Sequence, residues 1–215
     1  MLLAPRSKFL LIGDSVTDAE RTRPVGEGLF NAYGKGYVAN VEALLSATIP
    51  DHAIRVVNMG CGGHTVLDLK KRWQTDVLDL KPDWLSIAIG INDVWRQFDM
   101  PLITEAAVAL ETYAATLEEL VVQTKPTLKG LILMTPYLIE PIKTDLMRAR
   151  MDQYGAVVRD LAAKHGAVFV DLQAAFDDAL TNRHSSSLAW DRIHPNAAGH
   201  MVIARALLKA IGYQW

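Results

Sequence analysis

Short apolar runs alternate with longer amphipathic segments along the whole chain. Five runs have the length and β-rich composition of buried parallel strands, at residues 8–12, 55–59, 84–89, 131–135 and 168–171. Between them, apolar residues recur every three or four positions, as in helices, over residues 37–48, 104–124, 147–165 and 196–211. The alternation predicts an α/β protein, with a five-stranded parallel sheet between two helical layers in a three-layer α/β/α fold.

The segments without this patterning are predicted to be loops. They cover residues 14–36, 60–64, 90–101, 135–145 and 181–195. The first four follow predicted strands at their carboxyl ends, which is where open α/β sheets place their ligands. No repeat, low-complexity tract or linker divides the chain, so we predict one domain over residues 1–215.

Composition narrows the classes of protein to consider. The net charge is −2, and the 22 basic residues are spread along the chain, so nucleic acid is not an expected partner. Cys61 is the single cysteine and cannot form an internal disulfide. No apolar run approaches the roughly 20 residues of a membrane span. Pro5, Arg6 and Lys8 interrupt the apolar start, and cleavage of a signal peptide would remove the motif at Gly13, so we predict a cytoplasmic protein.

The first chemical candidate is the tripeptide Gly13-Asp14-Ser15, which directly follows the first predicted strand. A sharp turn there lifts a serine hydroxyl above the edge of the sheet, as a nucleophile requires. Gly-Asp-Ser is also an ordinary turn composition, so the tripeptide alone does not establish catalysis.

Asp191 and His194 are the second candidate, three residues apart in the loop before the last predicted helix. This spacing lets the carboxylate bind one ring nitrogen while the other nitrogen faces a hydroxyl. The alternative is a surface pair without function, next to a proline, Pro195, that starts the helix.

Hydrogen-bond donors follow the second and third predicted strands. The glycine-rich segment at residues 58–65 allows the backbone N–H groups to come close to a ligand, and Asn92 offers a side-chain amide. Such donors hold a tetrahedral oxyanion. Alternatively, the glycines are turn residues and Asn92 braces its own loop.

In this order, these elements resemble the conserved blocks of the SGNH (GDSL-like) hydrolases. The matching segments are GDSVTD at residues 13–18, VNMGCGGHT at 57–65, IGINDVW at 89–95 and AWDRIHP at 189–195. Together they resemble the bacterial acetylxylan esterase branch and cover essentially the whole chain. The resemblance implies a flavodoxin-like fold and a serine esterase that needs no metal and no cofactor.

The resemblance also implies a role for each residue. Ser15 is the nucleophile, His194 the base and Asp191 the residue that orients it. The oxyanion hole comprises the N–H groups of Ser15 and Gly63 and the amide of Asn92, with Gly60 as the alternative to Gly63. The substrate-binding residues are expected to be Asp14, Trp95 and Trp190.

The expected substrate is an acetylated xylo-oligosaccharide or a related carbohydrate, because Trp95 and Trp190 flank the motifs and aromatic faces stack on sugar rings. Either ring could instead pack in the core or between subunits. A short-chain lysophospholipase or thioesterase remains an alternative, as does a catalytically silent carbohydrate-binding protein. A nucleotide-binding protein would require a glycine-rich turn where Asp14-Ser15 stands. The apolar end at residues 212–215 is consistent with a homo-oligomer, although terminal aromatic rings can equally fold back on their own domain.

Overall fold

The chain folds around one parallel sheet. The computed structural model describes residues 1–215. The strands are β1 (Lys8–Gly13), β2 (Arg55–Gly60), β3 (Trp84–Ala88), β4 (Gly130–Met134) and β5 (Val168–Val170). They pair in the order β2-β1-β3-β4-β5, with every pair parallel. This order confirms the predicted five-stranded, flavodoxin-like α/β fold.

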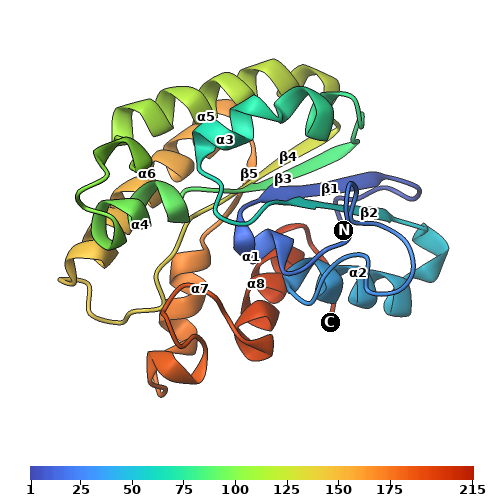
Figure 1. Ribbon diagram of the computed structural model, residues 1–215. Helices are drawn as coiled ribbons and strands as arrows, with labels where there is room; N and C mark the ends of the chain where they lie inside the picture. The colour runs from blue at the N-terminus through green and yellow to red at the C-terminus, as the bar shows by residue number, and fades with distance from the viewer.

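Helices cover both faces of the sheet (Figure 1). One layer contains α3 (Val66–Lys71), α4 (Ile91–Asp99), α5 (Leu110–Thr124) and α6 (Leu146–His165). The other contains α1 (Ser15–Asp18), α2 (Tyr37–Thr48), α7 (Leu172–Ala179) and α8 (Ala197–Ala210). Short helical turns occupy Pro50–His52, Gln74–Leu78, Thr104–Ala106, Lys125–Thr127 and Ser185–Ser187. None of the helices combines the length and apolar character needed to cross a bilayer.

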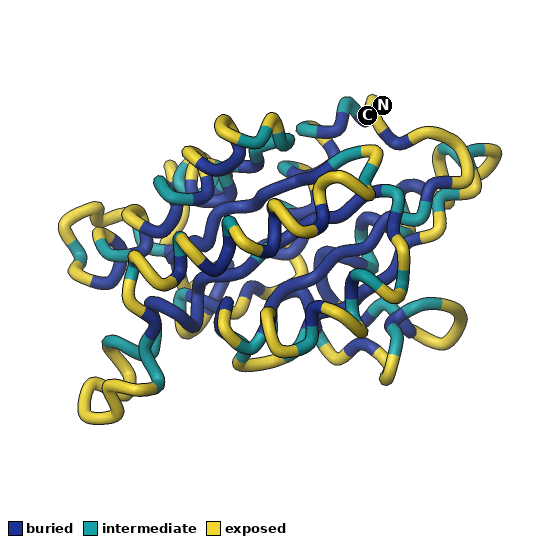
Figure 2. Tube along the Cα trace, turned by 90° about the horizontal axis from the view of Figure 1, so that it is seen from above, coloured by how far each residue is buried: buried dark blue, intermediate teal, exposed yellow.

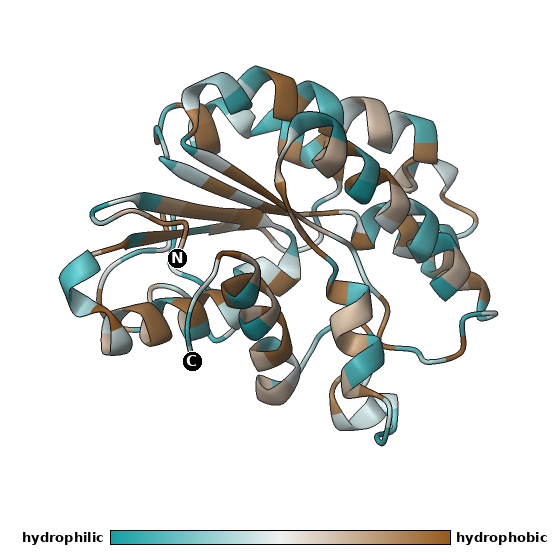
Figure 3. Ribbon diagram, turned by 180° about the vertical axis from the view of Figure 1, so that it is seen from behind, coloured by the Kyte–Doolittle hydropathy of each residue, from teal (hydrophilic) through white to brown (hydrophobic).

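The core lies on the two faces of the sheet. Figure 2 shows the strands buried along most of their length, and Figure 3 shows them as the most hydrophobic part of the chain. Because helices cover both faces, the strands are nearly continuous apolar runs instead of alternating ones. A single cluster of 54 buried hydrophobic residues joins the sheet to both layers. The carboxyl ends of the strands are therefore held rigidly, and the loops that leave them start from fixed positions.

Several element predictions were wrong in detail. The segment at 90–101, expected to be a loop, contains helix α4, and the helix expected from residue 104 begins at Leu110 after a separate short turn. Helix α4 does have apolar residues at helical spacing, namely Ile91, Val94, Trp95 and Phe98. The polar Asn92 and Asp93 interrupt this pattern. Helices α1, α3 and α7 were not predicted, since each has eight residues or fewer. The correction for α4 places Asn92 in the first turn of a helix, on a firmer support than a loop.

Candidate active site

Ser15 is the first residue of helix α1, directly after strand β1. Asp14 caps this helix, since its carboxylate accepts a hydrogen bond from the Val16 N–H at 3.0 Å. A side chain at Gly13 would place its Cβ 2.3 Å from the carbonyl oxygen of Ala88, so the turn is packed directly against strand β3. The close packing and the cap together fix the serine hydroxyl at the edge of the sheet.

The Ser15 hydroxyl is the start of a chain of hydrogen bonds. Its oxygen lies 2.8 Å from His194 Nε2, and His194 Nδ1 lies 2.6 Å from Asp191 Oδ2. The two side chains come from distant parts of the chain, since 179 positions separate the serine from the histidine. The structure thus brings together the three residues that the sequence singled out.

Asp191 is held as a carboxylate by its surroundings. Burial acts to raise its pKa, but hydrogen bonds from the His194 ring and from the N–H groups of His194 and Ile193 outweigh burial and lower the pKa below its usual value. The group is consequently ionised at neutral pH. An ionised acceptor beside Nδ1 keeps a proton on that nitrogen and leaves Nε2 to accept a proton from the serine.

The loop that carries Asp191 and His194 is tied down by polar contacts. Arg192 adopts a left-handed backbone conformation, with φ of 66°. Its guanidinium lies 2.9 Å from a carboxylate oxygen of Glu140 and 3.2 Å from one of Asp145. The hydroxyl of Tyr137 donates to the carbonyl of Ile193. These contacts connect the loop to the segment that follows strand β4.

The glycines after strand β2 differ in whether their N–H groups are already engaged. The Gly60 N–H donates to the Asn58 side chain at 2.9 Å, and the Gly62 N–H donates to Asp18 at 3.0 Å. Gly63 has a φ of 78°, which favours glycine, and its N–H donates no hydrogen bond within the chain. Of the two glycines considered from sequence, only Gly63 has an N–H free to bind a ligand.

Asn92 contributes an amide from helix α4. Its Nδ2 donates to the carbonyl of His64 at 3.0 Å, and its Oδ1 accepts from Arg96 at 3.2 Å. The second N–H of the amide is not used by either contact. Sequence reasoning missed Arg96, although a helical pattern over α4 would have placed it one turn after Asn92.

The three residues expected to bind substrate occupy different environments. The Trp95 ring is partly buried and meets the His194 ring edge-on, with 5.8 Å between centroids. Trp190 is 90% exposed, beside Asp191. Asp14 is 2% exposed, and burial raises its pKa to about 6.

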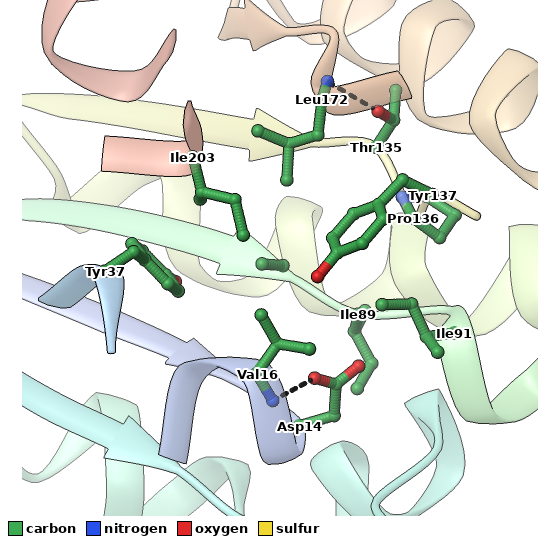
Figure 4. Close-up of a pocket in the computed structure, with 11 residues that line it drawn as sticks. Asp14, Val16, Tyr37, Ile89, Ile91, Thr135, Pro136, Tyr137, Leu172 and Ile203 are labelled. Carbon is green, nitrogen blue, oxygen red and sulfur yellow. Dashed lines mark hydrogen bonds between the residues drawn. The ribbon is translucent and has the colours of Figure 1, made fainter. Parts of the chain in front are cut away.

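A small pocket lies beneath the serine turn (Figure 4). Asp14 reaches it from one side and the Tyr137 ring from another, and most of the remaining wall is apolar. It has room for about one water molecule, so it cannot hold a sugar or an acyl chain. A substrate must therefore approach Ser15 from the exposed side.

Nowhere in the structure do three or more His, Cys, Asp or Glu side chains gather in a metal-binding arrangement.

The profile of the GDSL-like lipase/acylhydrolase family matches residues 11–202. The chain belongs to this family. It is 55% identical over 215 residues to an acetylxylan esterase of Geobacillus stearothermophilus, covering 100% of this chain and 98% of the relative. The match confirms the resemblance inferred from the motifs.

Solved structures agree with this assignment. The crystal structure of that esterase, Axe2, superposes with a TM-score of 0.99 at 55% identity, covering 100% of this chain and 98% of Axe2. LAE5, described as an α/β hydrolase from the metagenome of Lake Arreo, has a TM-score of 0.98 at 56% identity, covering 99% and 98% of the two chains. Among the solved forms of Axe2 are the variants S15A, D191A and H194A, each described as a catalytic mutant of that protein. The present chain is thus an enzyme, a carboxylic ester hydrolase.

Proposed function

We propose that this esterase removes acetyl groups from acetylated xylo-oligosaccharides, with Ser15, His194 and Asp191 as its catalytic triad. The observation that carries the proposal is the unbroken chain of hydrogen bonds, 2.8 Å from Ser15 to His194 and 2.6 Å from His194 to Asp191. The acetylxylan esterase relative and its catalytic mutants at the same three numbers support it.

In the first half of the reaction, Ser15 Oγ attacks the ester carbonyl while His194 Nε2 takes the hydroxyl proton. The tetrahedral intermediate collapses, the bond from the carbonyl carbon to the sugar oxygen breaks, and His194 returns the proton to the leaving sugar hydroxyl. An acetyl group is then esterified to Ser15. In the second half, His194 deprotonates a water that attacks the acetyl carbon. The bond from this carbon to Ser15 Oγ breaks, His194 returns the proton to Oγ, and acetate leaves. Asp191 keeps the imidazole in the correct tautomer and stabilises its charged form.

The negative charge on the tetrahedral intermediate requires donors that are not already engaged. The Ser15 N–H lies at the start of helix α1, where no intrahelical acceptor exists. The Gly63 N–H and the second N–H of the Asn92 amide are likewise free of partners. We assign these three groups to the oxyanion hole and prefer Gly63 to Gly60, whose N–H is bound to Asn58.

The surroundings of the serine favour a short acyl group on a bulky, polar alcohol. The pocket beneath the turn is too small for an acyl chain, and the exposed side carries the Trp190 ring and the partly exposed Trp95 ring. We assign the two rings to the sugar. Asp14 is buried, so we assign it the support of the turn instead of a substrate contact. The cytoplasmic location and the homo-oligomeric state stay predictions.

The deciding experiment measures acetate release from acetylated xylo-oligosaccharides beside a series of nitrophenyl esters from acetyl to octanoyl. We expect the acetyl ester to react at least about tenfold faster than the longer esters, and Ser15→Ala to lower kcat by about 10⁴-fold or more.

Ser46→Ala is the matched control, because Ser46 lies on the exposed side of α2 and its hydroxyl contacts only Glu42. This variant should retain full activity. Preference for octanoyl would refute the carbohydrate substrate, and activity that survives loss of the Ser15 hydroxyl would refute the mechanism.

A further inference from the structure

We propose that Arg96 is a positioning residue that fixes the orientation of the Asn92 amide. The inference rests on the proposed function, in which this amide is an oxyanion donor. Arg96 does not touch the serine or the histidine. It acts through the carboxamide that does the binding.

The amide is held between two partners of opposite kind. Asn92 Nδ2 donates to the His64 carbonyl at 3.0 Å, and Arg96 Nη2 donates to Asn92 Oδ1 at 3.2 Å. A backbone carbonyl can only accept a hydrogen bond, and a guanidinium can only donate one. Rotating the amide by half a turn would place Asn92 Oδ1 against the carbonyl oxygen of His64 and the N–H groups of Nδ2 against those of the Arg96 guanidinium. Only one orientation satisfies both partners, and it leaves one N–H of Nδ2 for the oxyanion.

The Asn92 side chain would lose this constraint on one side without Arg96. Asn92 as a residue is 1% exposed, so water cannot readily replace the missing donor. A carboxamide that spends part of its time inverted presents an oxygen to the developing oxyanion, which repels it. The cost therefore falls on the transition state, where the negative charge is largest, and not on binding of the neutral ester.

Arg96 is itself held in place. It lies four residues after Asn92 in helix α4, so both side chains project from the same face. Its guanidinium also pairs with Asp99, and its central carbon lies 4.9 Å from the centroid of the Trp95 ring. Because these contacts already fix the guanidinium, it loses little rotamer freedom when it binds Asn92 Oδ1. It therefore restricts the amide more than a mobile side chain would.

The contact with Trp95 extends this arrangement towards the base. The Trp95 ring meets the His194 ring edge-on, with centroids 5.8 Å apart. The guanidinium thus also lies against the Trp95 ring, but its effect on turnover is assigned to the Asn92 amide. Helix α4 is the frame for both contacts.

The test is a double-mutant cycle on Asn92 and Arg96, measured as kcat and KM with an acetyl ester. We expect Arg96→Ala to lower kcat by roughly 10- to 100-fold while KM changes less than about threefold. Asn92→Ala should lower kcat by about 100- to 1,000-fold. In the Asn92→Ala background, Arg96→Ala should cost less than about threefold, because the group it positions is gone.

Two further variants separate positioning from a general effect on the fold. Arg96→Lys keeps a donor but loses the planar fork, and kcat should lie between the values of wild type and Arg96→Ala. Arg150→Ala is the matched control: Arg150 stacks on Tyr154 at 5.3 Å and donates to Gln97 of the same helix at 3.1 Å, away from Asn92. Its kcat should remain within about twofold of wild type.

A second readout follows the oxyanion directly. An aryl methylphosphonate traps the serine as an anionic tetrahedral adduct, and Arg96→Ala should slow this trapping by the same factor as kcat. Equal loss from Arg96→Ala with and without Asn92, or an unchanged kcat in Arg96→Ala, would overturn the inference. Activity that survives Ser15→Ala would instead overturn the proposed function, so the two failures are distinguishable.

Discussion

Two aspartates stand beside Ser15 and His194, and their surroundings are opposite. Asp14 precedes the serine, is 2% exposed and has a pKa raised to about 6 by burial. Asp191 precedes the histidine, its side chain is 38% exposed, and the net effect of its hydrogen bonds is a lowered pKa. Both accept hydrogen bonds from backbone N–H groups, so capping alone does not explain the contrast.

In the proposed triad, this contrast pairs a rigid serine turn with a charged aspartate beside the histidine. The serine turn is packed into the sheet, where an ionised carboxylate costs stability. The histidine loop lies at the surface, where polar contacts hold it and a carboxylate stays ionised. Substitution of Asp14 should therefore mainly alter stability, and substitution of Asp191 should mainly alter turnover.

The largest expected effect comes from Asp191→Asn. The amide can still accept from the backbone N–H groups of Ile193 and His194, so the loop should keep its shape. It cannot stabilise a charged imidazole, and its N–H group favours the wrong histidine tautomer. We expect kcat to fall by about 10⁴-fold, measured as initial rates on the acetyl ester.

Stability provides the control for this variant. The free energy of unfolding should change by less than about 1 kcal/mol, because the site is partly exposed. A variant that retains a tenth of wild-type kcat, or one that loses its fold, would contradict the division between the two regions.

The same contrast explains what could be predicted from sequence. The position of His194 could be expected only from the family resemblance. Ser15 and Asn92 directly follow strands β1 and β3, so their proximity could be expected from the regular alternation of strands and helices. The contacts that orient them could not. The Asp18 carboxylate accepts a hydrogen bond from the Gly62 N–H, 44 positions further along the chain. Whether the Gly60 or the Gly63 N–H is free depends on partners that no local pattern reveals. Such contacts follow from packing and not from local periodicity.

Asp14→Asn tests the buried side of the comparison through its pH dependence. The folded-state pKa of about 6 lies above the ordinary value of 3.8 for an aspartate carboxyl. The protonated form is thus favoured in the folded state, and stability falls as pH rises from about 4 through the folded pKa. Above that range the ionised group should cost roughly 3 kcal/mol. The asparagine can still cap Val16 but does not titrate.

Urea unfolding at several pH values between 4 and 8 measures this effect. The wild type should lose stability relative to the variant as pH rises, with the difference developing between pH 4 and 7. Asp93 and His200 also titrate with shifted pKa values, but they are present in both proteins. Parallel pH profiles for the two proteins would show that Asp14 does not carry the destabilising charge.

The smallest expected effect concerns the contacts that hold the histidine loop. Arg192→Ala and Arg192→Gly remove the same ion pairs to Glu140 and Asp145, but only glycine suits the φ of 66° at this position. We expect kcat to fall by about tenfold in both, because the loop loses an anchor beside the triad.

The two variants should differ in stability. Glycine relieves a left-handed conformation that costs an alanine roughly 1–2 kcal/mol, while its extra freedom in the unfolded chain offsets part of the gain. The glycine variant should therefore unfold at a free energy about 0.5–1 kcal/mol higher than the alanine variant. Equal stabilities would mean that the loop relaxes once its ion pairs are gone. In that case polar side-chain contacts, and not the backbone conformation of residue 192, would determine the shape of the loop that carries His194.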